Sequence, residues 1–104
     1  MNDRLFAITD AVTTTSEGYY QHMLDGDKYV ANGTLSGSAL TMQKALYNLI
    51  HFAGVPFVQA IDMCSIIPLR LMHKIDEVGL LKKSYPAQAI VLDNGYNIIG
   101  NIGL

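Results

Sequence analysis

A carboxylate placed directly after an apolar run is the first position in this sequence that could do chemistry. Leu5 to Thr9 is a short, β-prone apolar run, and Asp10 follows it at once. This pattern predicts a buried strand with a carboxylate just beyond its C-terminal end. Catalytic groups occupy that place in barrel enzymes, where a carboxylate can act as a general base or acid. Taken alone, the pattern more often marks a carboxylate that caps a neighbouring loop.

A run of small and hydroxyl-bearing residues from Gly33 to Ser38 is the second candidate. It lacks the Gly-Lys-Ser/Thr of a phosphate-binding loop, but it precedes a predicted helix N-terminus at Thr41, where backbone N–H groups stabilise ligand oxygens. We expect Leu35 to Ser38 to form a loop with unpaired N–H groups, at the mouth of the same site as Asp10. By itself the run is equally consistent with a plain turn.

The metal-ligating and nucleophilic side chains show no catalytic signature. His22, His51 and His73 are too far apart for a local metal site, and we expect surface or half-buried histidines. Cys64 has no basic neighbour, which favours an inert core thiol. A single cysteine cannot form an internal disulfide, and Met1 to Arg4 do not begin a signal peptide. Both observations predict a reducing, cytoplasmic location.

Several elements must position these residues, and the first is a predicted hairpin. Its strands are Tyr19 to Leu24 and Lys28 to Val30, and the turn dipeptides Asp25-Gly26 and Asn32-Gly33 punctuate them. A helix follows, capped by Thr41 and stopped by Gly54 and Pro56. Its apolar face consists of Met42, Leu46, Leu49, Ile50 and Ala53.

The rest of the chain alternates short apolar segments with helix breakers. A second helix begins near Pro56 and ends at Ser65, with Val58, Ile61 and Met63 as its expected buried residues. We also expect a short helix over Ile66 to Met72 started by Pro68, and a short strand over Val78 to Leu81. The last element is a hairpin of Ala89 to Leu92 and Tyr96 to Ile99 around Asp93-Asn94-Gly95.

The composition indicates a surface that is covered by protein. Half of the 104 residues are apolar and only 15% are charged, where about 25% is typical of soluble domains. No apolar stretch approaches the ~18 residues of a membrane helix, so we expect no membrane partner. The net charge is −2 and the basic residues are scattered, which argues against nucleic acid.

The two candidate positions, taken with the residues around them, resemble one known family. Ile8 to Ala11, then Asn32 to Met42, then Asn48-Leu49 are similar in order and spacing to the C-terminal part of N-acetylglucosamine-6-phosphate deacetylases of the amidohydrolase superfamily. The likeness continues through Ala60 to Met63, Pro68 to Arg70, Val78 to Leu80 and the last hairpin, and so covers nearly the whole chain.

The resemblance implies an α/β fold that is a fragment of a metal-dependent (β/α)8 barrel. Residues 1–77 would hold the last barrel strand, a hairpin and helices, and residues 78–104 the C-terminal hairpin of the accompanying β-sandwich. Asp10 matches the family's catalytic aspartate after the eighth strand, which takes a proton from a metal-bound water and passes one to the leaving amine. The residues matching the loop that contacts the amino-sugar phosphate substrate are Leu35, Ser36, Gly37 and Ser38.

The resemblance also implies what this chain lacks. The family's metal ligands, a glutamate and two histidines, precede its eighth strand, so the divalent metal of the complete enzyme, zinc or iron, would be held by residues upstream of this chain. The segment between Asp10 and Gly33 is shorter than usual by roughly one hairpin, and Ser84 to Gln88 replaces the usual Gly-Lys-x-Ala-Asp. We therefore expect this fragment alone to hold no metal and to be inactive.

Two functional readings remain. In the first, the chain is the C-terminal portion of a deacetylase that removes acetate from an N-acetylated amino-sugar phosphate. In the alternative, it is a non-catalytic module that associates with itself or with another subunit. A single barrel strand leaves unpaired backbone groups on both edges. We therefore expect a homo-oligomer, or pairing with a missing N-terminal part, that covers Phe6, Ile8 and the Met42–Leu46–Leu49 face.

Overall fold

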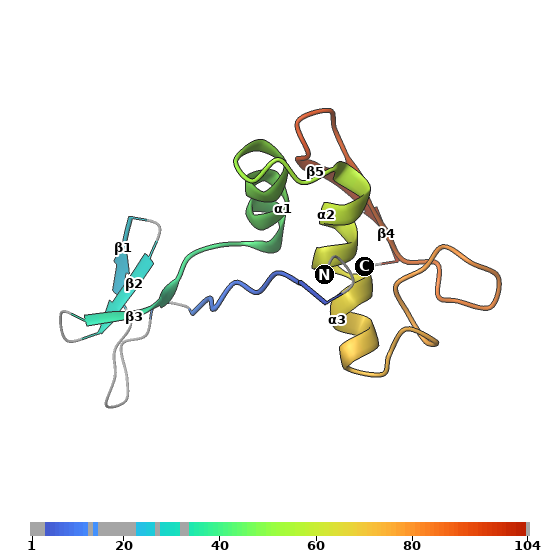
Figure 1. The fold of residues 1–104 in the computed structure, drawn as a ribbon, viewed down its shortest axis with the longest axis horizontal. Coiled ribbons are helices and arrows are strands. Elements are labelled where there is room, and N and C mark those ends of the chain that lie inside the picture. Colours follow the sequence, from blue (N-terminus) through green and yellow to red (C-terminus); the bar gives the residue numbers. More distant parts are fainter. Residues whose placement is uncertain (1–3, 13, 15–22, 27, 32–33, 104) are drawn as a thin grey trace.

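The computed structural model describes residues 4–12, 14, 23–26, 28–31 and 34–103. In this part of the chain three helices lie between two small antiparallel sheets, in an elongated arrangement of 48 × 31 × 29 Å (Figure 1). The elements are, in chain order, β1 (Met23–Asp25), β2 (Lys28–Ala31), β3 (Thr34–Ser38), α1 (Met42–His51), α2 (Phe57–Cys64), α3 (Ile66–Leu71), β4 (Ala89–Leu92) and β5 (Ile98–Ile102). This α/β content agrees with the predicted fold class.

The first sheet has the strand order β1-β2-β3. Met23 pairs with Val30 across β1 and β2, and Ala31 pairs with Thr34 across β2 and β3. The predicted hairpin is therefore confirmed where it is described, and residues 19–22 of its first strand lie outside the described residues.

The expected strand over residues 5–9 is wrong. This segment runs extended from the helices toward β3 (Figure 1), and it joins a ladder only beyond its end, where Ala11 forms an isolated parallel bridge with Ser38. Along the way the N–H of Ala7 donates to the C=O of Met63 at 3.0 Å. Ile8 is 70% exposed. A barrel strand is buried by neighbours on both edges, and no described strand lies beside this segment.

Helix α1 has the predicted cap and stop. The Thr41 hydroxyl oxygen accepts the N–H of Lys44 at 3.1 Å, and Gly54 adopts a φ of +67° three residues after the helix ends. Ala45 and Leu46 are buried against the rest of the chain. Leu46 therefore does not belong to an open face that a partner must cover.

Helices α2 and α3 are separated at Ser65, as predicted. The Ser65 hydroxyl donates to the C=O of Ile61 at 2.8 Å. Met63 is buried as expected, whereas Val58 is 70% exposed, so the expectation for Val58 is wrong. Helix α3 begins two residues before Pro68. Proline is tolerated there because its missing N–H belongs to the first turn, which has no helical acceptor.

The strand expected over residues 78–81 is also absent from the structure. The N–H groups of Glu77 and Val78 bond back to the C=O of Lys74, and Gly79 has a φ of +98°. Both features belong to turns, because a strand requires negative φ and bonds to another strand.

The final hairpin is confirmed, with its second strand two residues later than predicted. Tyr96 has a φ of +63° and so belongs to the turn. The carboxylate of Asp93 accepts the N–H groups of Gly95 and Asn97, each at 2.9 Å. Large apolar side chains remain exposed on both strands, among them Ile90, Val91, Ile98, Ile99 and Ile102. The division of the chain at residues 77 and 78 stays a prediction.

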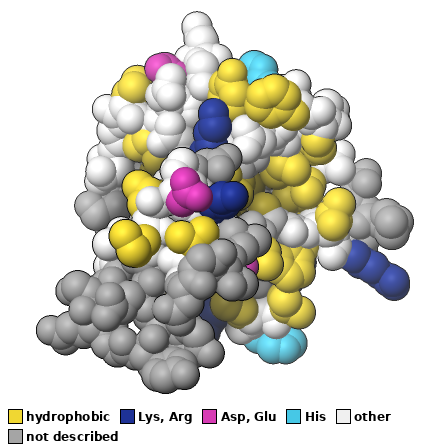
Figure 2. Space-filling view, turned by 90° about the vertical axis from the view of Figure 1, so that its left-hand side faces the viewer, with side chains coloured by type: hydrophobic (Ala, Val, Ile, Leu, Met, Phe, Trp, Pro, Cys, Tyr) yellow, Lys and Arg dark blue, Asp and Glu magenta, His cyan; other side chains and the backbone are white. Residues whose placement is uncertain are grey.

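None of the helices in the described residues is long and apolar enough to cross a membrane. Hydrophobic side chains nevertheless reach the surface in several places between the few charged ones (Figure 2). Exposed apolar side chains that lie together are the kind of surface that protein contacts cover.

We predict that the isolated chain self-associates through the surface around Ile8. Replacing this exposed apolar side chain, Ile8→Ser, should shift the population toward monomer more than Leu81→Ser does, although Leu81 is the more exposed of the two. Sedimentation velocity over a dilution series measures the effect. A parent chain that stays monomeric at every concentration would contradict the prediction.

The turn at Asp93 predicts a pH dependence. The N–H and side-chain amide of Asn97, with the N–H of Gly95, hold the pKa of the Asp93 carboxyl below its ordinary value. The folded-state pKa is depressed, so this stabilisation is complete above the unfolded pKa of about 3.9 and is lost as the pH falls through the folded pKa. Asp93→Asn should remove that part of the acid sensitivity.

Amide chemical shifts of Gly95 and Asn97, followed from pH 6 downward by NMR, give the measurement for Asp93. The parent chain should show a titration below about pH 4, and Asp93→Asn should not. An identical low-pH titration of these amides in both proteins would show that Asp93 is not its source.

Candidate functional site

The segment that ends at Asp10 reaches the C-terminal end of β3. Asp10 is exposed and has a φ of +50°, a left-handed conformation that aspartate tolerates better than most residues. Its C=O accepts the N–H of Ser38 at 2.9 Å, and the N–H of Val12 donates to the C=O of Ser38 at 3.2 Å. The structure thus brings Asp10 and Ser38 together through their backbones.

The side chain of Ser38 adds a second set of contacts at the same place. Its hydroxyl donates to the C=O of Thr9 and accepts the N–H of Leu40, the latter at 3.3 Å. The Thr9 hydroxyl oxygen in turn accepts the N–H of Ala11 at 3.2 Å. Residues on both sides of Asp10 are therefore held by hydrogen bonds, and Ser38 takes part in most of them.

Gly37 allows the two segments to approach this closely. Gly37 is buried, and a Cβ atom built on it would lie 2.8 and 2.9 Å from the two methyl groups of Val12 and 3.1 Å from the C=O oxygen of Asp10. A Cβ atom essentially never lies within 3.0 Å of a non-bonded atom in a folded protein. The close approach of Asp10 and Val12 to β3 therefore depends on the absence of a side chain at position 37.

The prediction that Leu35 to Ser38 form a loop with open N–H groups is wrong. These residues belong to β3 and pair with β2, with Leu35 opposite Val30, and with an irregularity that leaves Ser36 without a partner in the register. The dipeptide Asn32-Gly33, which lies outside the described residues, separates two β-prone runs in the sequence. It is the signal that could have predicted a second hairpin here.

The structure adds two residues to this site that the sequence did not suggest. Thr9 and Val12 contact Ser38 from either side of Asp10. Neither contact has a sequence signal, because the partners are more than 25 positions apart in the chain and meet only through the parallel bridge at Ala11.

The other chemically suggestive residues do not join this site. His51 packs against the ring of Tyr47 with centroids 4.1 Å apart, and His22 lies outside the described residues. Cys64 is half-buried, and burial raises the pKa of its thiol, which keeps it in the unreactive protonated form. Among the described residues, no three His, Cys, Asp or Glu side chains are grouped so that they could hold a metal ion.

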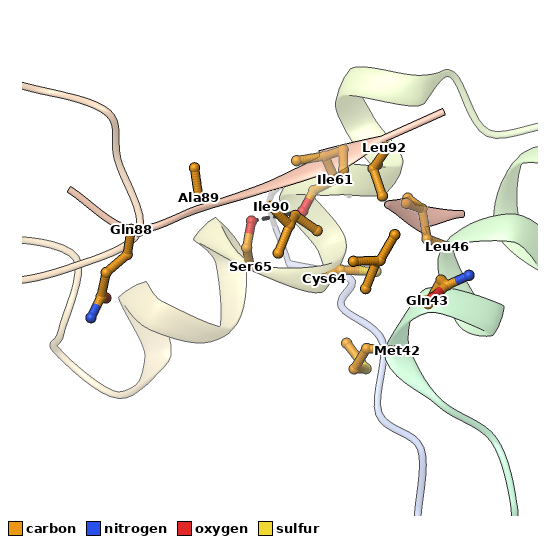
Figure 3. A pocket seen from close by; sticks show the side chains of 12 residues that line it. Met42, Gln43, Leu46, Ile61, Cys64, Ser65, Gln88, Ala89, Ile90 and Leu92 are labelled. Carbon is orange, nitrogen blue, oxygen red and sulfur yellow. Dashed lines mark hydrogen bonds between the residues drawn. The ribbon is translucent and has the colours of Figure 1, made fainter. Parts of the chain in front are cut away.

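A hollow lies elsewhere, between α1, α2 and the β4–β5 hairpin (Figure 3). Its volume is about 390 Å³, and most of its wall is apolar, including Leu46, Ile61, Cys64 and Ile90. The Ser65 hydroxyl on its wall is bonded to the C=O of Ile61 (Figure 3). Since the wall carries no charged side chain, it offers no carboxylate for acid–base chemistry, which the junction at Asp10 does. The junction of Asp10 with β3 is the better candidate site.

Comparison with known proteins identifies relatives for the sequence, although no family model matches it. The chain is 26% identical over 110 residues to N-acetylglucosamine-6-phosphate deacetylase from Haemophilus influenzae, covering 96% of this chain and 29% of the relative. It is 29% identical over 104 residues to N-acetylgalactosamine-6-phosphate deacetylase from Escherichia coli, covering 92% of this chain and 28% of the relative.

The structure is also similar to a solved one. It matches N-acetylglucosamine-6-phosphate deacetylase from Pasteurella multocida with a TM-score of 0.84 and 23% identity, over 96% of this chain and 28% of that protein. The resemblance inferred from the sequence is confirmed, and this likeness extends it to the fold. This chain spans less than a third of each of these three relatives.

The packing at Gly37 yields a prediction for stability. Gly37→Ala should destabilise the chain by about 1–3 kcal/mol, as overpacking usually does, because its new methyl group meets Val12 and the Asp10 carbonyl. Val12→Ala removes the two methyl groups concerned, so the double variant should recover part of the loss. Urea denaturation of the parent, both single variants and the double variant measures the coupling. Strictly additive losses would contradict the proposed contact.

Proposed function

We propose that this chain is the C-terminal share of an amide hydrolase that removes acetate from an N-acetylated amino-sugar phosphate. The observation that carries the proposal is the placement of Asp10, an exposed carboxylate held at the end of β3 by hydrogen bonds on both sides. The names of the relatives supply the reaction and the substrate class. The activity belongs to the complete protein, because the relatives are more than three times as long.

The chemistry proposed for Asp10 follows from its carboxyl group. An ionised carboxylate within hydrogen-bond reach of a water molecule can take its proton as the water attacks the amide carbon. The protonated carboxyl then delivers that proton to the nitrogen that leaves as the amine. This cycle returns Asp10 to its ionised form and needs a carboxyl group that is open to the substrate, as the exposed Asp10 is.

In the proposed function, the metal ion would be bound by the part of the enzyme that this chain does not contain. The described residues of this chain do not fit a metal ion, since they group no three suitable side chains. We place the zinc or iron of the complete enzyme on residues that precede this chain.

We further propose how this chain fits into the fold of the complete enzyme and which of its residues lie near the substrate. Residues 5–9 are extended but pair with no described strand of this chain, and in the complete enzyme they would pair with strands of the missing part in a (β/α)8 barrel. Strands β4 and β5 would be a share of the β-sandwich. Leu35, Ser36 and Gly37 would line the substrate side of the site as part of β3 rather than as a loop, while Ser38 at the end of the strand is bonded to the segment of Asp10. We also propose that the complete enzyme is cytoplasmic.

The alternative of a non-catalytic module receives no support from the relatives, which are named as deacetylases. Exposed apolar residues such as Ile8 and Phe52 fit either reading, because both require protein to cover them. The two readings differ in whether Asp10 is needed for turnover.

A pair of chimeras tests the proposed function. This chain would replace the matching 28% of the Pasteurella multocida enzyme and the matching 29% of the Haemophilus influenzae enzyme. Acetate release from N-acetylglucosamine-6-phosphate is the measurement. We expect at least one chimera to be active, and Asp10→Asn to lower its kcat by about 10²–10⁴-fold, the usual contribution of general acid–base catalysis.

Asp76→Asn serves as the matched control, because Asp76 is an exposed aspartate in a turn and should keep parent activity. Near-parental turnover of Asp10→Asn in an active chimera would remove Asp10 from the reaction. Two inactive chimeras would count against the assignment of this chain to such an enzyme.

A further inference from the structure

We infer that Ser38 is a positioning residue for Asp10 rather than a residue that contacts substrate. The inference rests on the proposed function of Asp10 and deepens it. It follows from the hydrogen bonds that Ser38 makes to the residues around Asp10, and it changes the role that the resemblance implied for this serine.

The backbone of Ser38 fixes the peptide units on either side of Ala11. Its N–H donates to the C=O of Asp10 at 2.9 Å, and its C=O accepts the N–H of Val12 at 3.2 Å. This pair forms the parallel bridge between Ala11 and Ser38. Any residue at position 38 could make these two bonds, so they place the segment without requiring serine.

The hydroxyl group is what makes serine specific at this position. It donates to the C=O of Thr9, the residue just before Asp10, and it accepts the N–H of Leu40 at 3.3 Å. A hydroxyl has one hydrogen to donate, and Ser38 uses it within the chain. The group is therefore not available to donate to a substrate oxygen while this arrangement persists.

The conformation of Asp10 explains why such support is needed. Its φ of +50° lies in the left-handed region, which costs free energy for a residue with a side chain even though aspartate tolerates it better than most, so bonds to its surroundings help to hold it there. Ser38 anchors the C=O of Thr9 on one side and the C=O of Asp10 on the other. The two anchors bracket the φ and ψ rotations of Asp10 and so set the direction of the Cα–Cβ bond that carries its carboxyl group.

Loss of the hydroxyl should therefore affect the chemical step more than substrate binding. Ser38→Ala keeps both backbone bonds and removes the anchor on Thr9. Because misplacement of a reacting group by about 1 Å can cost 10²-fold in rate, we expect kcat to fall by about 10–100-fold. The KM should change by less than about 2-fold, since the lost bond is not made to substrate. Ser38→Thr, which retains a hydroxyl, should restore most of kcat.

The matched control is Ser65→Ala. Ser65 also donates its hydroxyl to a main-chain carbonyl, that of Ile61 at 2.8 Å, but it lies at the junction of α2 and α3, away from Asp10. This variant should keep the kcat of the parent. A comparable fall in kcat for Ser65→Ala would show that loss of any such bond acts through general stability.

Steady-state kinetics of the active chimera separate this inference from the proposed function. If Asp10→Asn abolishes turnover while Ser38→Ala leaves kcat unchanged, the positioning role is overturned and the proposed function stands. If Ser38→Ala raises KM with kcat intact, Ser38 binds substrate and the inference is wrong. If Asp10→Asn is fully active, the proposed function fails, and the positioning role fails with it.

A measurement on the 104-residue chain itself tests the geometry without any activity. The amide of Leu40 should exchange its hydrogen at least several-fold faster in Ser38→Ala than in the parent or in Ser65→Ala, because it loses the hydroxyl acceptor. Equal exchange rates of the Leu40 amide in the three proteins would overturn the arrangement from which the inference is drawn.

Discussion

The close backbone contact between residues 10–12 and the end of β3 is the constraint on which the rest of the candidate site depends. Two hydrogen bonds and a parallel bridge make the contact, and the absence of a side chain at Gly37 allows it. Without this contact, Asp10 would end an extended segment that has no described strand beside it. A carboxylate needs a defined place before it can act as a base, and here that place is set by backbone geometry.

The same extended segment explains why so much apolar surface is exposed. Leu5 and Ile8 are exposed, whereas a buried parallel strand has neighbouring strands at both edges and helices over its face. The final hairpin has the same difficulty, since a two-stranded sheet is marginal in water and its isoleucines are exposed on both strands. Only 15% of the residues are charged. This low fraction is consistent with apolar side chains occupying surface positions on these elements.

Local signals predicted the elements whose causes are local. Thr41 caps α1, Ser65 separates α2 from α3, and Asp93 organises the turn before β5 through bonds to residues within four positions. The failures share the opposite property. Whether Leu5 to Thr9 becomes a strand depends on partners elsewhere in space, and Val58 is exposed because the helix presents Ala60 and Met63 to the interior instead. An apolar residue reveals its preference for burial but not the neighbour that provides it.

The sequence by itself determined the helices and turns, the position of Asp10 after an apolar run, and the resemblance to deacetylases, because short-range propensities and motifs suffice for these. Only the tertiary structure decided that Leu35 to Ser38 pair with β2 instead of forming an open loop, and that Ser38 reaches back to Thr9. The physical reason is that a hydrogen bond between residues 29 positions apart has no local signature. Such a hydrogen bond forms only where the fold brings two distant segments together. Here the parallel bridge between Ala11 and Ser38 joins them.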